Sequence, residues 1–364
     1  MPVASQRLVN FSSGPAVLPE PVLLEAQRNL FMLPGVGMSV LEISHRSKTF
    51  DRILQEAEAD LRSVAGITDD HAVLFLQGGA SLQFSMLPMN LLTPGRSADY
   101  VVTGVWSQKA IAEARRVGEV RVAGTTENER FARVPRPQEL DLDASAAYVH
   151  LTTNNTIYGT QWPAMPDVGD VPLVVDASSD LLGAPTDFSK FGAVYGGAQK
   201  NLGPSGVTLV VIRRDLLARS ASTLHTMLNY AVQAENRSLY NTPNTFGIYI
   251  LGLVLRWFKT EGGLAVIGER NQRKAAAVYA EIDRTGFYQG HAAADSRSRH
   301  NITFRLRDES LEDAFVKEST AAGLDGLKGH RSVGGLRASI YNAFPEAGVT
   351  ALVEFMREFE RTRG

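Results

Sequence analysis

The sequence contains no cysteine, and this absence excludes several kinds of site at once. Disulfide bonds, thiolate zinc sites and cysteine nucleophiles all require that residue. Nothing else in the pattern of residues indicates a metal site, and we expect none. A chain without cysteine fits a cytoplasmic enzyme.

Long apolar runs and an excess of charge of either sign are also absent. No run approaches the roughly 18 apolar residues of a membrane-spanning helix, and the N-terminal stretch lacks the apolar segment of a signal peptide. The formal net charge is −2. We therefore expect neither a nucleic acid nor a membrane as a partner.

What the chain does have is ordinary globular composition over 364 residues, with 44% hydrophobic and 21% charged residues. Compact apolar runs predict strands at 72–77, 99–103, 119–123, 147–151, 172–176, 193–196 and 207–212. Helical spacing between or before them predicts helices at 19–33, 48–65, 79–91, 106–117 and 213–219. This alternation indicates an α/β fold with a mostly parallel sheet covered by helices on both faces.

The pattern changes after about residue 245. Long helices are expected at 245–260 and 263–285, followed by the order strand, helix, strand, helix at 300–307, 309–322, 335–341 and 345–363. This is typical of a smaller α+β C-terminal domain. We predict an N-terminal arm (1–15) associated with the small domain, a large domain (16–255) and a small domain (256–364).

Two strand ends carry residues that form a recognisable chemical pair. Lys200 follows the apolar stretch at 193–196 and the small residues Gly197 and Ala198, which let other groups approach the backbone closely. Desolvation in such surroundings disfavours the charged amine and makes it a nucleophile. Asp176 ends an earlier buried strand. A pyridoxal 5'-phosphate (PLP) enzyme needs a lysine that forms a Schiff base and an aspartate that keeps the pyridine nitrogen protonated.

Each residue also has an ordinary interpretation. A lysine among glycines is commonly an exposed turn residue, and an aspartate after a strand is commonly a helix N-cap. The argument therefore depends on the residues around them.

Three further features are expected at the same edge of the sheet. The turn Gly78-Gly79-Ala80-Ser81 between a strand and a helix can present backbone N–H groups to a phosphate. Trp106 opens a helix after a strand and can stack on a flat ring, although tryptophan is often a core residue. Thr156 follows another strand and can hydrogen-bond a ring substituent, or can belong to a polar turn. Ligands of open α/β sheets bind at the carboxyl ends of the strands.

Longer motifs make the chain similar to a known family. They are Phe11-Ser-Ser-Gly-Pro-Ala16, Ser44-His-Arg46, Gly104-Val-Trp-Ser107, Gly197-Ala-Gln-Lys-Asn201, Tyr240-Asn-Thr-Pro243 and the segment Lys328–Asn342. With these motifs the chain resembles, nearly end to end, the phosphoserine aminotransferase family, PLP enzymes of fold type I in the class V aminotransferase group. Family members transfer the amino group of glutamate to 3-phosphohydroxypyruvate and, in pyridoxine biosynthesis, act on 4-phosphohydroxythreonine.

The resemblance implies a role for each motif residue. Lys200 would form the Schiff base, Asp176 would bind the pyridine nitrogen, Trp106 would stack on the ring and Thr156 would lie beside it. The cofactor phosphate would be bound by Ala80, Ser81 and Gln199, and by Asn241 and Thr242 of a neighbouring subunit. The resemblance thus implies a homodimer with shared active sites.

The resemblance also implies how one pocket accepts both substrates. Arg337 would bind the α-carboxylate, and the distal carboxylate or phosphate would be bound by His45, Arg46, His330 and Arg331. Guanidinium groups suit both anions. Many family members have an arginine in the glycine-rich turn where this chain has Ser81, which supplies no positive charge.

Four other functions can be weighed against this resemblance. A cysteine desulfurase is excluded because it needs a cysteine, and a short-chain dehydrogenase because the dinucleotide-binding glycine pattern is absent. An aminotransferase of the alanine–glyoxylate or serine–pyruvate type, and a non-catalytic anion-binding protein on the same scaffold, stay open as alternatives.

Overall fold

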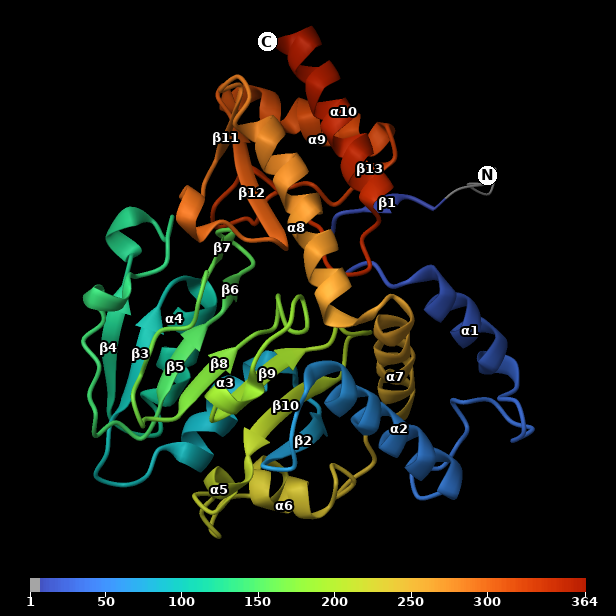
Figure 1. Cartoon of the computed structure of the whole chain (residues 1–364), viewed down its shortest axis with the longest axis vertical. Helices are drawn as coiled ribbons and strands as arrows, with labels where there is room; N and C mark the ends of the chain where they lie inside the picture. Colours follow the sequence, from blue (N-terminus) through green and yellow to red (C-terminus); the bar gives the residue numbers. More distant parts are fainter. Residues whose placement is uncertain (1–6) are drawn as a thin grey trace.

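The computed structural model describes residues 7–364, and its centre is a seven-stranded sheet (Figure 1). The strand order is β2-β10-β9-β8-β5-β3-β4. β10 runs antiparallel to both of its neighbours, and the other six strands are parallel to one another. The bounds are β2 His71–Leu76, β3 Ala98–Val102, β4 Val120–Thr125, β5 Val149–Thr152, β8 Leu173–Asp176, β9 Ala193–Gly197 and β10 Thr208–Arg213.

Both faces of this sheet are covered, because successive strand residues point to opposite sides. On β2, Val73 and Phe75 pack into one apolar core, whereas Leu74 and Leu76 pack into a second one on the other face. The first core includes residues of α2 and α7, and the second includes residues of α3 and α4. The helices of this part are α1 Glu20–Phe31, α2 Lys48–Ala65, α3 Gly79–Leu91, α4 Val105–Ala114, α5 Arg214–Leu217, α6 Tyr230–Glu235 and α7 Thr245–Thr260.

A smaller antiparallel sheet, β11-β12-β14, has its own apolar core with α8, α9 and α10. In Figure 1, α8 runs from the side of the large sheet up into this second unit. The bounds are α8 Gly263–Ile282, β11 Tyr288–Gly290, β12 Asn301–Leu306, α9 Glu312–Ala321, β14 Leu336–Ser339 and α10 Glu346–Arg363. No helix among residues 7–364 combines the length and the apolar character needed to cross a membrane.

The N-terminal arm reaches this second unit through a short parallel pair, β1 (Val9–Asn10) with β13 (Leu324–Asp325). The first six residues of the predicted arm, 1–6, lie outside the described residues. A second short pair joins β6 (Asn154–Asn155) to β7 (Thr160–Gln161).

The predicted α/β fold with a mostly parallel sheet is confirmed, and most predicted elements lie where the patterns placed them. The helix expected at 263–285 ends at Ile282, and the one expected from 309 begins as a short 3-10 turn before α9. The short strands β1, β6, β7, β11 and β13 and helix α6 were not predicted. Two or three residues are too few to show a period in the sequence.

Candidate active site

Five sequence features meet at one edge of the large sheet because the strands that precede them are parallel. β2 leads into the glycine turn, β3 leads into α4 with Trp106, and β5 leads into the turn with Thr156. β8 ends at Asp176, and Lys200 lies in the turn after β9.

Lys200 is half-buried, and its Nζ donates a hydrogen bond to Thr156 Oγ1 at 2.8 Å. Burial lowers the pKa of Lys200 to about 8, an effect opposed by the nearby Asp176 carboxylate and increased by the Arg337 guanidinium. The amine is therefore available in its neutral, nucleophilic form much more often than an exposed lysine.

Asp176 is buried, with 4% of its surface exposed. Its Oδ1 accepts hydrogen bonds from the Ser178 amide at 3.0 Å and the Ser178 hydroxyl at 2.6 Å. Burial raises the pKa of Asp176, and the Lys200 ammonium and Ser178 oppose this. No hydrogen bond from residues 7–364 reaches Oδ2, so this oxygen can accept one from a protonated ring nitrogen.

The glycine turn fits a phosphate group. Gly78 and Gly79 have φ values of 87° and 67°, in the left-handed region that glycine enters at low cost. They begin the 13-residue helix α3, whose N-terminus has no side-chain cap. Ala80 and Ser81 lie in its first turn, where backbone N–H groups lack partners within the helix and favour an anion.

Trp106 lies at the start of α4, and the Nζ of Lys200 is 5.6 Å from the centroid of its ring. The indole is half-buried, and its buried Nε1 has no hydrogen-bond partner within the described residues. A flat aromatic side chain beside a nucleophilic lysine and a buried carboxylate fits the pyridine ring of PLP.

Arg337 on β14 is brought to the same place from the second unit. Its guanidinium donates to the Thr156 carbonyl at 3.3 Å and to Ser13 Oγ at 2.7 Å. Thr156 therefore contacts both Lys200, through its hydroxyl, and Arg337, through its carbonyl. The buried Nε of Arg337 has no partner among residues 7–364 and can donate to a bound carboxylate.

His330 and Arg331 lie in the loop before β14, which is closed by a hydrogen bond from Gly329 N to Gly335 O at 2.8 Å. Burial and the nearby cations Arg337, Arg331 and Lys109 lower the pKa of His330. Arg331 is exposed.

The other predicted residues form a second group. His45 Nδ1 and Thr242 Oγ1 are 3.4 Å apart, and the Thr242 carbonyl accepts a hydrogen bond from Gln77 at 3.2 Å. Arg46 and Asn241 are exposed. Within residues 7–364, no hydrogen bond or ion pair joins this group to Lys200 or Arg337. The group is bonded to the rest of the site through Gln77, which directly precedes the glycine turn.

Gln199 is half-buried beside Lys200, and its carbonyl accepts a hydrogen bond from the Ala16 amide at 2.9 Å. The N-terminal arm thus passes directly beside the lysine.

Three residues of this region were missed from the sequence. Ser13 binds Arg337. Asp180 accepts hydrogen bonds from Thr153 and, at 3.1 Å, from Gln161, and burial raises its pKa to about 6. Lys109 has its Nζ 4.7 Å from the Trp106 ring centroid. Two of them had a signal in the sequence: Ser13 lies within the motif Phe11–Ala16, and Lys109 lies three residues after Trp106, a spacing at which helical residues share a face.

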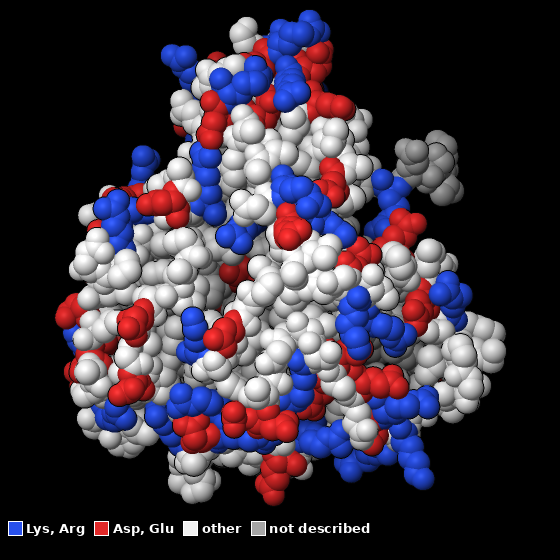
Figure 2. Space-filling model, viewed as in Figure 1, with Lys and Arg blue, Asp and Glu red and all other residues white. Residues whose placement is uncertain are grey.

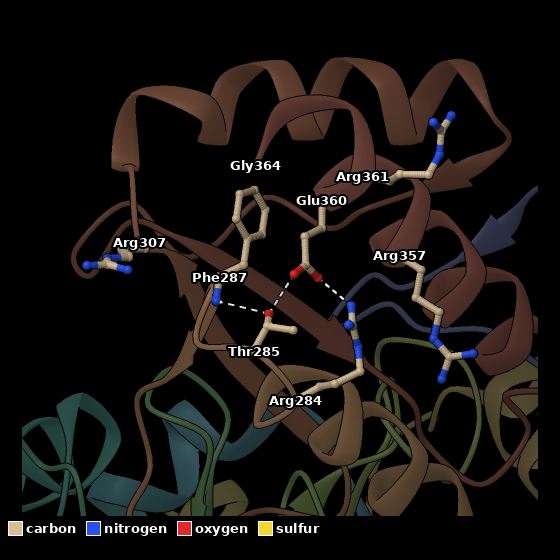
Figure 3. Close-up of a pocket in the computed structure, with 8 residues that line it drawn as sticks. All are labelled: Arg284, Thr285, Phe287, Arg307, Arg357, Glu360, Arg361 and Gly364. Carbon is tan, nitrogen blue, oxygen red and sulfur yellow. Dashed lines mark hydrogen bonds and ion pairs between the residues drawn. The ribbon is translucent and has the colours of Figure 1, made fainter.

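A hollow of about 660 Å³ at the outer end of the second unit contains none of the predicted residues (Figure 3). Its Glu360 is bonded to Arg284 and Thr285, while Arg307 and Arg361 point away from the centre of the view. Charges of both signs are interspersed over the face of the molecule in Figure 2. Neither the hollow nor the surface charge indicates a second active site beside the one at the edge of the large sheet.

Comparisons with known proteins agree with this geometry. Residues 8–352 match the family model "Aminotransferase class-V". The phosphoserine aminotransferase of Herpetosiphon aurantiacus is 54% identical over 356 residues, which cover 98% of this chain and 99% of that protein. The solved phosphoserine aminotransferase of Bacillus circulans subsp. alkalophilus is 51% identical, with a TM-score of 0.97 and coverage of 99% and 100%.

Structures of lower sequence identity show that a similar fold can accompany a different activity. The PLP-bound phosphoserine aminotransferase of Trichomonas vaginalis is 36% identical, with a TM-score of 0.92 and coverage of 96% and 100%. An alanine–glyoxylate aminotransferase from Nostoc sp. is only 19% identical, with a TM-score of 0.76 and coverage of 99% and 97%, so it shares the fold alone. The chain belongs to the class-V aminotransferase family and, within it, to the phosphoserine aminotransferases.

Proposed function

We propose that the chain is a PLP-dependent phosphoserine aminotransferase that acts in serine biosynthesis. It transfers the amino group of L-glutamate to 3-phosphohydroxypyruvate and yields 2-oxoglutarate and O-phospho-L-serine in a ping-pong reaction. The observation that carries this function is the pair of contacts made by Thr156, which brings a nucleophilic lysine and a carboxylate-binding arginine to one point.

Bound PLP supplies an aldehyde that condenses with amines and a protonated ring that withdraws electrons from the adjacent carbon. The residues that would hold it are Lys200 by a covalent bond, Asp176 at the ring nitrogen, Trp106 on a face of the ring, and Thr156 beside it. Ala80, Ser81 and Gln199 would hold its phosphate.

Lys200 has two tasks in this proposal. Its amine would hold the cofactor covalently, and as a free amine Lys200 Nζ would take the proton from the substrate α-carbon. Its lowered pKa suits both tasks, because the neutral amine is the nucleophile and the base. Asp176 would bind the ring nitrogen. Burial raises the pKa of its carboxyl group, and the Lys200 charge and the hydrogen bonds from Ser178 to Oδ1 oppose that rise and favour the carboxylate.

Arg337 orients the substrate by binding its α-carboxylate. Its donors already point at oxygen atoms of Thr156 and Ser13, so a carboxylate can take the place of these acceptors without rearranging β14. The distal anion is bound by His330 and Arg331.

We also propose that His45, Arg46, Asn241 and Thr242 complete the site of a second copy of the chain in a homodimer. The lack of any hydrogen bond or ion pair between these residues and Lys200 or Arg337 within residues 7–364 supports this. The segment before His45 is strongly apolar and exposed, with 88% of Phe31 and 58% of Leu41 accessible. Such a patch favours burial against another surface.

Dimerisation can be tested apart from catalysis. Phe31→Glu combined with Leu41→Glu should shift sedimentation toward the monomer and reduce transamination, because each site would lose its partner's residues. A matched double change of the exposed Val117 and Val122 to Glu, outside this segment, should leave a dimer. An unchanged sedimentation coefficient for the Phe31/Leu41 variant would contradict the proposed interface.

Two further proposals concern the division of the chain into domains and its location in the cell. The division into an arm (1–15), a large domain (16–255) and a small domain (256–364) is supported by the separate apolar core of the second unit. A cytoplasmic location is supported by the absence of cysteine from the sequence.

The function is tested by three half-reactions on one preparation: O-phosphoserine, glutamate and alanine, followed by the absorbance of bound PLP. We expect fast reaction with the first two and slow reaction with alanine, whose methyl group offers nothing to His330 or Arg331. A preference for alanine would favour the alanine–glyoxylate type instead. Lys200→Ala should abolish turnover, and Lys200→Ala with near-normal turnover would refute the mechanism.

A further inference from the structure

Lys109 is a cation at the edge of the site to which no role has been assigned. It lies three residues after Trp106 on α4, so the two side chains share a face of the helix. Its Nζ is 4.7 Å from the centroid of the Trp106 ring, and the Nζ of Lys200 is 5.6 Å from the same centroid. One indole ring thus has both the catalytic amine and a second ammonium group beside it.

The Lys109 ammonium is not used elsewhere. It forms no ion pair within the described part of the chain, and its side chain is exposed. A carboxylate was available one turn along the same helix, at Glu113, but that group pairs with Arg116 at 3.7 Å. Lys109 instead lies over the indole, where the ring attracts a cation.

The same ammonium lies close enough to His330 to affect it. Lys109 is one of three cations, with Arg331 and Arg337, that together with burial lower the pKa of His330. His330 Nδ1 accepts a hydrogen bond from the Ser332 amide at 3.2 Å, so the proton of the neutral ring is on Nε2. His330 can donate a hydrogen bond to an anion but brings no charge to it.

The two substrates differ in the charge that this pocket must bind. A phosphate monoester carries about −1.5 to −2 at neutral pH, whereas the distal carboxylate of glutamate carries about −1. Ser81 contributes no charge, Arg337 is used by the α-carboxylate, and His330 is neutral. Of the residues that we place at the distal group, Arg331 of this chain and Arg46 of a second copy then supply the charge. A phosphate, which carries more charge than a carboxylate, gains more from one further cation.

We propose that Lys109 is a specificity-determining residue, whose ammonium binds the distal phosphate of the phosphorylated substrate and is dispensable for glutamate. This inference rests on the proposed function, because it names how the same site separates its two substrates. The effect of its charge on the pKa of His330 indicates that the ammonium already lies on the side of the pocket where we place the distal group.

The test compares wild type, Lys109→Met and Lys109→Arg in single half-reactions with O-phosphoserine and with glutamate. Lys109→Met keeps most of the apolar stem over Trp106 and removes the charge. We expect its apparent Kd for O-phosphoserine to rise about 10-fold with a limiting rate within 2-fold of wild type, and its Kd for glutamate to change less than 3-fold. Lys109→Arg should restore most of the affinity, and the difference should shrink as salt is raised.

The matched control is Lys317→Met, which removes an exposed lysine from α9. It should leave both half-reactions unchanged. Normal reaction of Lys109→Met with glutamate shows that this variant is folded and binds PLP. An equal loss of affinity for both substrates, or no loss for O-phosphoserine, would overturn the inference.

A second measurement separates this inference from the proposed function. If wild type fails to react with O-phosphoserine, the proposed function fails, but inorganic phosphate can still be tested as a competitor of glutamate. Lys109→Met should then raise the inhibition constant of phosphate about 10-fold. An unchanged constant would refute the role of Lys109 whatever the natural substrate is.

Discussion

The pKa of Lys200 is the property on which the proposed chemistry depends most directly, and it can be measured on the apoprotein. Burial lowers it to about 8 from 10.5, the ordinary pKa of a lysine. At a pH well below both values, a pKa lower by about 2.5 units means roughly 300 times more neutral amine. At pH 7 about 9% of Lys200 would be neutral, compared with about 0.03% for an ordinary lysine.

The assay is competitive labelling of the apoprotein with trace acetic anhydride between pH 6 and 11, read by mass spectrometry of the Lys200 peptide. The other lysine peptides of the chain correct for reagent hydrolysis. We expect labelling of Lys200 to reach half of its plateau near pH 8. Labelling that continues to rise beyond pH 10 would refute the argument from desolvation.

Two variants check the cause of the shift. The Asp176 carboxylate stabilises the ammonium and the Arg337 guanidinium destabilises it. Asp176→Asn should therefore move the midpoint of Lys200 to lower pH, and Arg337→Met should move it to higher pH. Shifts in the opposite directions would mean that these two charges do not act on the pKa of Lys200 in this way.

Three further predictions concern the framework of the site. Lys274 is 1% exposed. Its Nζ donates hydrogen bonds to the carbonyls of Ile340 at 3.0 Å, Tyr341 at 2.6 Å and Phe344 at 3.1 Å. Burial lowers the pKa of Lys274, and the three carbonyls offset the cost of burying its ammonium group. Lys274→Met should cost about 3–5 kcal/mol by leaving buried carbonyls unpaired. At about 2.1 cal/mol/K per residue this lowers the melting temperature by roughly 4–7 °C, whereas a change within 1 °C, as expected for Lys317→Met, would contradict it. Gly329→Ala places a Cβ against the Gly334 carbonyl and should displace His330, so KM for O-phosphoserine should rise several-fold at a nearly unchanged kcat; an unchanged KM would show that the loop adapts. The raised pKa of Asp180, about 6 against 3.8, means that its contribution to stability falls as pH rises from about 4 to 6. The melting temperature of Asp180→Asn relative to wild type should therefore increase over that range, and parallel pH profiles of the two proteins would count against a buried carboxyl here.

Much of the fold could be read from local patterns. The apolar runs that became β2, β8 and β9 are buried along their whole length, and such runs are recognisable without knowledge of the fold. β8 and β9 are parallel although only the 3-10 turn Phe188–Lys190 lies between them, and this arrangement places Asp176 and Lys200 at one edge. Pairs as short as β6 with β7 could not be predicted, because their only signal is the partner strand.

What the sequence by itself determined is the set of chemical groups and the strand ends that carry them. Lys200, Asp176, Trp106 and the glycine turn all depend on a few adjacent residues, and local backbone preferences decide such features. The absence of cysteine likewise excluded disulfide bonds, thiolate zinc sites and cysteine nucleophiles from the sequence alone.

Only the tertiary structure decided which of these groups meet. Arg337 reaches Thr156 across 181 residues and Ser13 across 324, and no local preference encodes contacts that depend on packing β14 and the N-terminal arm against the large sheet. The packing of α2 against α7 likewise brought His45 to Thr242, 197 residues further along the chain. Long-range burial, rather than any sequence motif, also lowered the pKa of Lys200, and this makes its neutral amine available for the proposed chemistry.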